Sequence, residues 1–288
     1  MSLGIGEVNG HIVGRVLKET VRRATVVIAK ERTIFEATGK PGHSGSMDDV
    51  FTSADTKAQE IYLRTFNECF PNCGVIGEED NLRIDPKNGC TSYFTVDPLD
   101  GTKAYIRRQS HGVATMVALV DKTEVISAYV GDVNTDEVYG YRPGSEKVFR
   151  ITRQDAFEEL LPGKKLEHQS EVHALLRDPL DIYRTNVQME VRGFGSYEVM
   201  GSSIGTWFAR IWKGEVSALV LPRGWQTPWD SAPVIGISEK LGYVFLQPAT
   251  DGSLYWHKYI PVISKEKYMC HHDTLVVHSN NLRLFNVR

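Results

Sequence analysis

The residues best suited to chemistry are two carboxylates, Asp97 and Asp100, which stand three positions apart in the segment FTVDPLDGT at 94–102. Residues 93–96 favour a short buried strand. Because Pro98 cannot donate to a sheet ladder, the chain is predicted to leave the sheet where the acids begin. In open α/β folds the loops at the carboxyl ends of strands line the ligand crevice, so the pair is a candidate site.

Two carboxylates this close on a turn repel each other unless a cation lies between them. No lysine or arginine immediately precedes the pair, so a metal ion is the predicted counter-charge. Oxygen ligands without an adjoining cysteine or histidine favour Mg²⁺, Mn²⁺ or Ca²⁺ over zinc. A second acidic run, GEED at 77–80, follows a short predicted strand at 75–76. Taken alone, such a run is more typical of a solvated turn.

The composition limits the partners that the chain could have. Its 288 residues are 41% hydrophobic and 24% charged, and their net charge of −3 gives no basic excess, so nucleic-acid and membrane partners are not expected. No apolar run reaches the roughly 18 residues of a membrane span, and no signal-peptide core is evident at the N-terminus, so a cytoplasmic location is expected. The four cysteines form no CxxC pair and are predicted to be reduced structural thiols.

The elements that must position the acids alternate between helices and strands. Periodicity predicts long helices at 8–36 and from Asp55 onward, separated by a glycine-rich loop at 39–46. After the acidic motif, β-rich runs predict a meander with strands at 113–120, 125–130 and 138–141.

The second half of the chain continues the alternation. It contains an apolar helical face at 204–212, a strand at 218–221 and a helix that begins at Pro228. We place a boundary near Arg150, between an N-terminal α+β subdomain (1–150) with most of the predicted metal ligands and a C-terminal α/β subdomain (151–288) with the specificity segments.

Three segments together resemble the signature of the inositol monophosphatase superfamily: GEED at 77–80, DPLDGT at 97–102 and WDSA at 229–232. Their order and spacing are specific, and the resemblance spans roughly residues 10–245. It implies a layered αβαβα sandwich of mixed α/β class and a Mg²⁺-dependent, lithium-sensitive phosphatase of small phosphomonoesters.

The resemblance also implies roles for individual residues. Two or three Mg²⁺ ions would be held by four carboxylates and one backbone carbonyl, those of Glu78, Asp97, Asp100, Asp230 and Leu99. Gly101 and Thr102 would offer backbone N–H groups to the substrate phosphate. Thr102, hydrogen-bonded to Asp55, would activate the attacking water together with Glu78.

The substrate is less clearly indicated. Inositol-specific members usually carry a glutamate seven residues before the aspartate of the W-D pair, where this chain has Arg223. Arg223 and the GSS segment, with Ser202 and Ser203, look more like the 3'(2'),5'-bisphosphate nucleotidase branch, in which a guanidinium suits a second phosphate. Inositol-1-monophosphatase or another sugar phosphatase remains the alternative, and a small phosphorylated metabolite is the expected partner. A homodimer is compatible with the sequence, which does not determine the oligomeric state.

Two further readings come from other motifs. GSSIG at 201–205 matches a nucleophile elbow, and Asp251 with His257 or His271 follow in the order of a serine hydrolase. However, the preceding residues make a poor strand, so Ser203 is a distant alternative nucleophile. A metal-loaded protein that acts only as a scaffold is a further alternative, but no predicted ligand is missing. The adjacent His271 and His272 do not converge in regular structure and have no predicted role.

Overall fold

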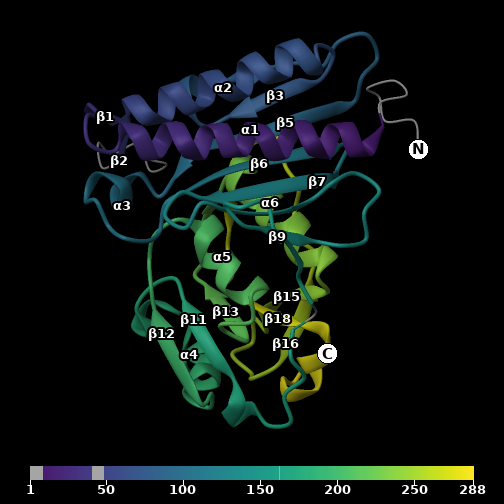
Figure 1. Ribbon diagram of the computed structural model, residues 1–288. Helices are drawn as coiled ribbons and strands as arrows, with labels where there is room; N and C mark the ends of the chain where they lie inside the picture. Colours follow the sequence, from purple (N-terminus) through teal and green to yellow (C-terminus); the bar gives the residue numbers. More distant parts are fainter. Residues whose placement is uncertain (1–8, 41–48, 162) are drawn as a thin grey trace.

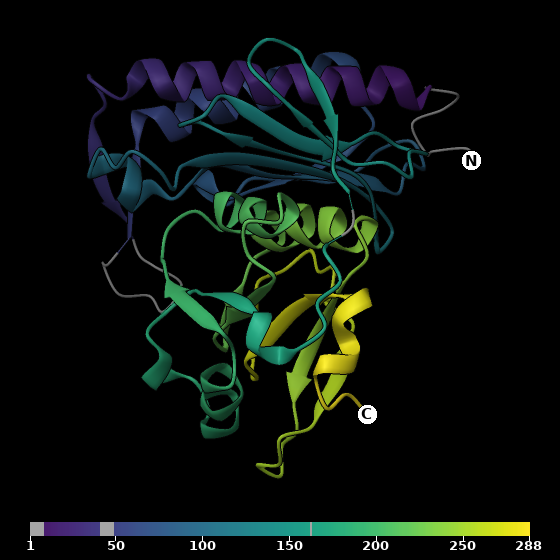
Figure 2. The same cartoon turned by 60° about the horizontal axis from the view of Figure 1, so that its bottom comes forward.

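The computed structural model describes residues 9–40, 49–161 and 163–288. It has five layers, in which helices and sheets alternate (Figure 1). Helices α1 (Gly10–Glu31) and α2 (Ser53–Cys69) cover one face of an eight-stranded sheet. Helices α5 (Ile204–Trp212) and α6 (Pro228–Lys240) lie between this sheet and a six-stranded sheet, and α4 (Thr185–Arg192) packs outside the second sheet. The view in Figure 2 shows the central helices between the two sheets. The αβαβα sandwich of mixed α/β class is therefore confirmed.

The outer helical layer consists of α1 (Gly10–Glu31) and α2 (Ser53–Cys69). Helix α2 begins at a capping box, in which the Asp55 side chain accepts from the backbone of the N-cap residue Thr52. The helix predicted at 8–36 ends earlier than expected, at Glu31, and is followed by β1 (Ala37–Lys40), which pairs with β2 (Asp49–Thr52). Most of the loop predicted at 39–46 lies outside the described residues.

The first sheet has the order β10-β9-β8-β7-β6-β5-β3-β4. The predicted meander forms its centre. The strands are β3 (Gly74–Gly77), β4 (Arg83–Ile84), β5 (Ser92–Asp100), β6 (Ala114–Asp121), β7 (Glu124–Asp132), β8 (Glu137–Tyr141), β9 (Phe149–Ile151) and β10 (Phe157–Glu159). Because β9 and β10 extend this sheet, the boundary predicted near Arg150 falls inside it.

Strand β5 corrects the prediction that the chain leaves the sheet at Asp97. Asp97 pairs with Met116 and Asp100 with Ala114, so Pro98 and Leu99 together face the single residue Thr115. This shift in register is a bulge, which lets the strand continue past a proline that has no N–H for the ladder. Both acids therefore lie on the last part of a fully buried strand.

The second sheet has the order β12-β11-β13-β18-β15-β16. Its strands are β11 (His173–Leu176), β12 (Ser196–Val199), β13 (Ala218–Leu221), β15 (Tyr243–Pro248), β16 (Trp256–Tyr259) and β18 (Thr274–His278). A separate pair joins β14 (Gly224–Gln226) to β17 (Tyr268–Cys270). The remaining α-helices are α3 (Thr102–Ile106), α4 (Thr185–Arg192), α5 (Ile204–Trp212) and α6 (Pro228–Lys240), while short 3-10 turns occur at Glu79–Asn81, Gln169–Glu171, Leu180–Ile182 and Ser279–Leu284.

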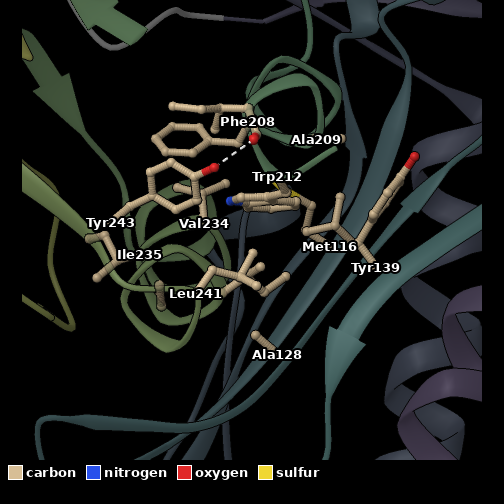
Figure 3. Packing of buried hydrophobic residues seen from close by; sticks show 14 of the residues in the cluster. Met116, Ala128, Tyr139, Phe208, Ala209, Trp212, Val234, Ile235, Leu241 and Tyr243 are labelled. Carbon is tan, nitrogen blue, oxygen red and sulfur yellow. Dashed lines mark hydrogen bonds between the residues drawn. The ribbon is translucent and has the colours of Figure 1, made fainter. Parts of the chain in front are cut away.

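The largest hydrophobic core lies between the two sheets, around helices α5 and α6. Trp212 is at its centre beside Tyr139 of the first sheet, and the Tyr243 hydroxyl of the second sheet donates to the Ile211 carbonyl oxygen of α5 at 2.7 Å (Figure 3). The two halves of the chain are thus joined by a shared core. Among the described residues, no helix combines the length and apolarity needed to cross a bilayer.

Candidate active site

Three carboxylates from two distant segments meet at the end of β5. Asp97 and Asp100 come from β5, and Asp230 comes from the first turn of α6. One oxygen atom from each of the three lies within 4.8 Å of the others. Asp97 is 2% exposed and Asp100 is 8% exposed, so these two carboxylates are largely withdrawn from water, whereas Asp230 is partly buried. The structure therefore brings together three of the four carboxylates expected to hold metal.

Local structure explains how each acid is held. Asp100 Oδ2 accepts a hydrogen bond from the Ser203 hydroxyl at 2.5 Å and from the Gly205 backbone N–H at 2.8 Å. Asp230 lies two residues after Pro228, in a helix start where the Thr227 hydroxyl accepts from the Asp230 N–H at 3.4 Å. The two helices between the sheets thus point their N-terminal ends at the acidic cluster, which this arrangement stabilises.

Burial and the neighbouring negative charges raise the pKa values of two carboxyl groups in the cluster. Burial, together with the charges of Glu78, Asp100 and Asp230, raises the pKa of Asp97 well above its usual range. Burial, and after it the charge of Asp230, raises the pKa of Asp100 to about 6, although its hydrogen bonds oppose the rise. Buried carboxylates that repel each other in this way favour binding of a cation.

Glu78, the fourth predicted carboxylate, lies at the next strand. Its backbone N–H donates to the Val96 carbonyl oxygen at 3.2 Å, one residue before Asp97. Its charge contributes to the raised pKa of Asp97. The parallel pairing of β3 with β5 places it there, because both strands end at the same edge of the sheet.

The cluster has the properties that a hard divalent cation requires. Its donors are all oxygen atoms, and Asp97 Oδ1 is buried without a hydrogen-bond partner among the described residues. An orphaned buried carboxylate oxygen is costly unless an ion satisfies it. The residues present therefore fit Mg²⁺ or a related ion, whereas they provide neither thiolate nor imidazole for a softer metal.

Gly101 follows the cluster in a conformation that only glycine tolerates well. Its φ is 90°, and a Cβ atom there would lie 2.2 Å from the Gly112 carbonyl oxygen. The Thr102 hydroxyl donates to the Leu99 carbonyl oxygen at 3.2 Å. Because the hydroxyl has only one proton, Thr102 does not make the predicted hydrogen bond to Asp55 in this structure. Asp55 Oδ2 instead accepts from the Thr52 N–H and hydroxyl.

The serine-hydrolase alternative does not fit the structure. Ser203 is fully buried, and its hydroxyl proton is donated to Asp100. Its oxygen also caps α5 by accepting from the Thr206 N–H at 3.1 Å. No histidine is hydrogen-bonded to Ser203 in the described part of the chain, and His271 is exposed. The sequence match to a nucleophile elbow is thus a helix cap that also anchors a carboxylate.

Two arginines lie at the ends of neighbouring strands. Arg223 follows β13, and its backbone N–H and Nη1 lie 3.0 Å and 3.5 Å from Oδ1 of the fully buried Asp273. Arg177 directly follows β11, and sequence reasoning missed it. Its one signal, a basic residue directly after the apolar run 174–176, is too common to single out.

Comparison with known proteins supports the resemblance. The sequence profile of the inositol monophosphatase family matches residues 11–279. The Nus factor SuhB of Xylella fastidiosa is 26% identical over 136 residues, which cover 45% of this chain and 48% of that protein. The chain thus spans about half the length of this relative. The 3'(2'),5'-bisphosphate nucleotidase CysQ of Shigella flexneri is 26% identical over 187 residues, which cover 63% of this chain and 69% of that protein.

The fold also matches solved structures. An IMPase/NADP phosphatase, solved in complex with NADP and Ca²⁺, superimposes with a TM-score of 0.69. The match covers 96% of this chain and 94% of that one at 16% identity. At this identity the likeness shows a shared fold, within which the acidic cluster described above lies.

Proposed function

The chain belongs to the inositol monophosphatase family, and on that premise we propose that it is a Mg²⁺-dependent phosphatase that hydrolyses a small phosphomonoester. The observation that carries the proposal is the convergence of Asp97, Asp100 and Asp230 within 4.8 Å. Buried carboxylates from two segments so far apart in sequence repel one another at this distance, and a bound cation would relieve that repulsion.

The metal would be held by four carboxylates and one backbone carbonyl, those of Glu78, Asp97, Asp100, Asp230 and Leu99. The family resemblance implies two or three metal ions. Bound Mg²⁺ would lower the pKa of water and neutralise the phosphoryl oxygens. The chain's own contribution is orientation. Ser203 and Gly205 fix one oxygen of Asp100, which leaves its other oxygen available as a ligand.

The residues after the acids would position the substrate phosphate. Gly101 allows close approach of the backbone because it has no side chain, and its N–H and that of Thr102 would donate to phosphate oxygens. The Thr102 hydroxyl, together with Glu78, would orient the attacking water at the metal.

For the substrate, we favour a nucleotide that carries a second phosphate, such as a 3'(2'),5'-bisphosphate. Arg223 supports this choice because its side chain is about half exposed and it lies two residues after the end of β13. An arginine recognises phosphate through paired N–H groups. An inositol phosphate is the second candidate, for which a carboxylate near this position would be the better partner.

The test is phosphate release from adenosine 3',5'-bisphosphate, inositol 1-phosphate and fructose 1,6-bisphosphate, each with Mg²⁺ and with EDTA. We expect Mg²⁺-dependent release that is fastest with the adenosine bisphosphate. Release from inositol 1-phosphate alone would refute the substrate but support the phosphatase. No release from any compound would refute the phosphatase and favour a binding role, in line with the relative that is named a Nus factor.

A further inference from the structure

Three parallel strands of the second sheet end at one edge, next to the acidic cluster. Strand β11 pairs in parallel with both β12 and β13. The residues that follow them are Arg177, then residues 200–203, then residues 222–223. Because Ser203 hydrogen-bonds to Asp100, this edge faces the carboxylates. The carboxyl ends of parallel strands are where ligands bind in such sheets.

Arg177 is the central residue of this edge. Its backbone N–H donates to the Val220 carbonyl oxygen at 3.1 Å, which holds it beside the start of the segment that carries Arg223. Its carbonyl oxygen would be 3.7 Å from a Cβ atom at Gly201. The backbone of Arg177 is therefore fixed between the two segments that flank it.

One N–H group of the Arg177 guanidinium is unpaired in the part of the chain that the structure describes. Its Nη1 is buried and has no hydrogen-bond partner among the described residues, and no ion pair to it is found there. Other half-buried arginines are paired: Arg210 makes hydrogen bonds of 2.8 Å and 3.1 Å to Glu198. A buried charged N–H without an acceptor is destabilising and calls for an explanation.

Arg177 is near the cluster but is not a ligand of it. Its positive charge lowers the pKa of Asp100, opposing the effect of burial, so the two groups lie within electrostatic range. Yet the hydrogen bonds that Asp100 accepts come from Ser203 and Gly205. Nη1 of Arg177 is thus left for an acceptor that the described residues do not provide.

We propose that Arg177 binds the phosphate of the substrate that is not cleaved, and so selects substrates with a second phosphate. This inference rests on the proposed phosphatase function. The cleaved phosphate is expected at the metal cluster, whereas Arg177 and Arg223, which follow neighbouring strands, would form a second subsite for phosphate. A planar guanidinium offers paired N–H groups to one phosphate, which a lysine does not.

The test uses two substrates that differ only in the second phosphate, adenosine 3',5'-bisphosphate and adenosine 3'-monophosphate. Arg177→Met should lower kcat/KM for the bisphosphate at least tenfold, mainly through KM, and change kcat/KM for the monophosphate less than threefold. Arg177→Lys should recover part of the loss, because it restores the charge but not the fork. Arg192→Met, at an exposed position on α4, is the control and should change neither substrate.

A binding measurement separates this inference from the proposed function. Adenosine 5'-monophosphate carries only the second phosphate, and its binding can be measured by calorimetric titration in EDTA. Its affinity for the Arg177→Met variant should be at least fivefold lower than for the wild type, even if the wild-type chain proves inactive. Equal losses for both substrates would show that Arg177 acts only by balancing the charge of Asp100, and would overturn the proposal. Unchanged binding and kinetics, with a wild-type melting curve, would overturn it as well.

Discussion

The Ser203 hydroxyl lies 2.5 Å from Asp100 Oδ2, a hydrogen bond between residues 103 positions apart. It connects the N-terminus of α5 to the end of β5, and so joins the second half of the chain to the first. A serine that looks like a nucleophile in the sequence is therefore a positioning residue in the structure. Its loss should affect folding and metal binding before it affects the chemistry itself.

Ser203→Ala should lower the free energy of unfolding by about 2–3 kcal/mol, because it removes a hydrogen bond to a carboxylate and a helix cap. Phosphatase activity should fall but recover at high Mg²⁺ concentration. Urea unfolding and a Mg²⁺ titration of activity measure the two effects, with Ser170→Ala, at an exposed position, as the control. Activity that collapses regardless of Mg²⁺ would contradict this role and revive the nucleophile.

Asp97→Asn and Asp230→Asn should each lose nearly all turnover, since each removes an oxygen ligand with full charge. In EDTA both variants should be at least as stable as the wild type, because repulsion within the cluster is relieved. Phosphate release measures turnover and urea unfolding measures stability. Asp181→Asn, at an exposed position, serves as the control. Substantial turnover in either variant would disprove the metal assignment.

The stability of the metal-free protein should depend on pH through Asp100. Its pKa is about 6 in the folded state, above its usual value of 3.8. The stabilising contribution of the protonated carboxyl is therefore complete below about pH 4 and is lost as the pH rises through 6. Relative to wild type, Asp100→Asn in EDTA should gain on the order of 2–3 kcal/mol between pH 4 and pH 7.5. A difference in unfolding free energy that does not change with pH would exclude this explanation.

Gly101→Ala should inactivate the protein and destabilise it by about 2–4 kcal/mol. The new Cβ atom would meet the Gly112 carbonyl oxygen at 2.2 Å in a backbone conformation with φ of 90°. Gly252→Ala is a matched control, because Gly252 has a φ of 81° but no atom within 4 Å of the added Cβ. Thermal melts of both variants separate crowding from backbone strain; equal effects would mean that crowding at Gly101 is unimportant.

The sequence predicted the architecture well, because periodicity leaves local patterns that located the α5 helix and the β13 strand. Two short motifs indicated Asp97, Asp100 and Asp230, which the structure brings within 4.8 Å of one another. The bulge in β5 was not predicted, because it depends on how the partner strand β6 pairs with it. The hydrogen bond from Ser203 to Asp100 was not predicted for a similar reason: the two residues are 103 positions apart.

Arg177 is a residue that could not be identified from the sequence. A single arginine after an apolar run has no pattern that separates it from a surface residue, and only the pairing of three parallel strands places it near the acids. Arg223 was noticed because it replaces a glutamate that the resemblance leads one to expect. What the structure adds is that both arginines follow adjacent strands.

The last prediction concerns Arg223, whose Nη1 lies 3.5 Å from Oδ1 of the fully buried Asp273. Arg223→Glu should lower kcat/KM for adenosine 3',5'-bisphosphate at least tenfold, since a charge-assisted contact to phosphate is worth about 1.5–3 kcal/mol. The glutamate would also repel Asp273 and reduce stability, so Arg223→Met, which removes the charge without adding another, is needed beside it. Both variants should change kcat/KM for adenosine 3'-monophosphate far less. If both substrates lose activity equally in Arg223→Met, or if the wild type prefers inositol 1-phosphate, Arg223 does not determine specificity, and the bisphosphate assignment fails while the phosphatase assignment stands.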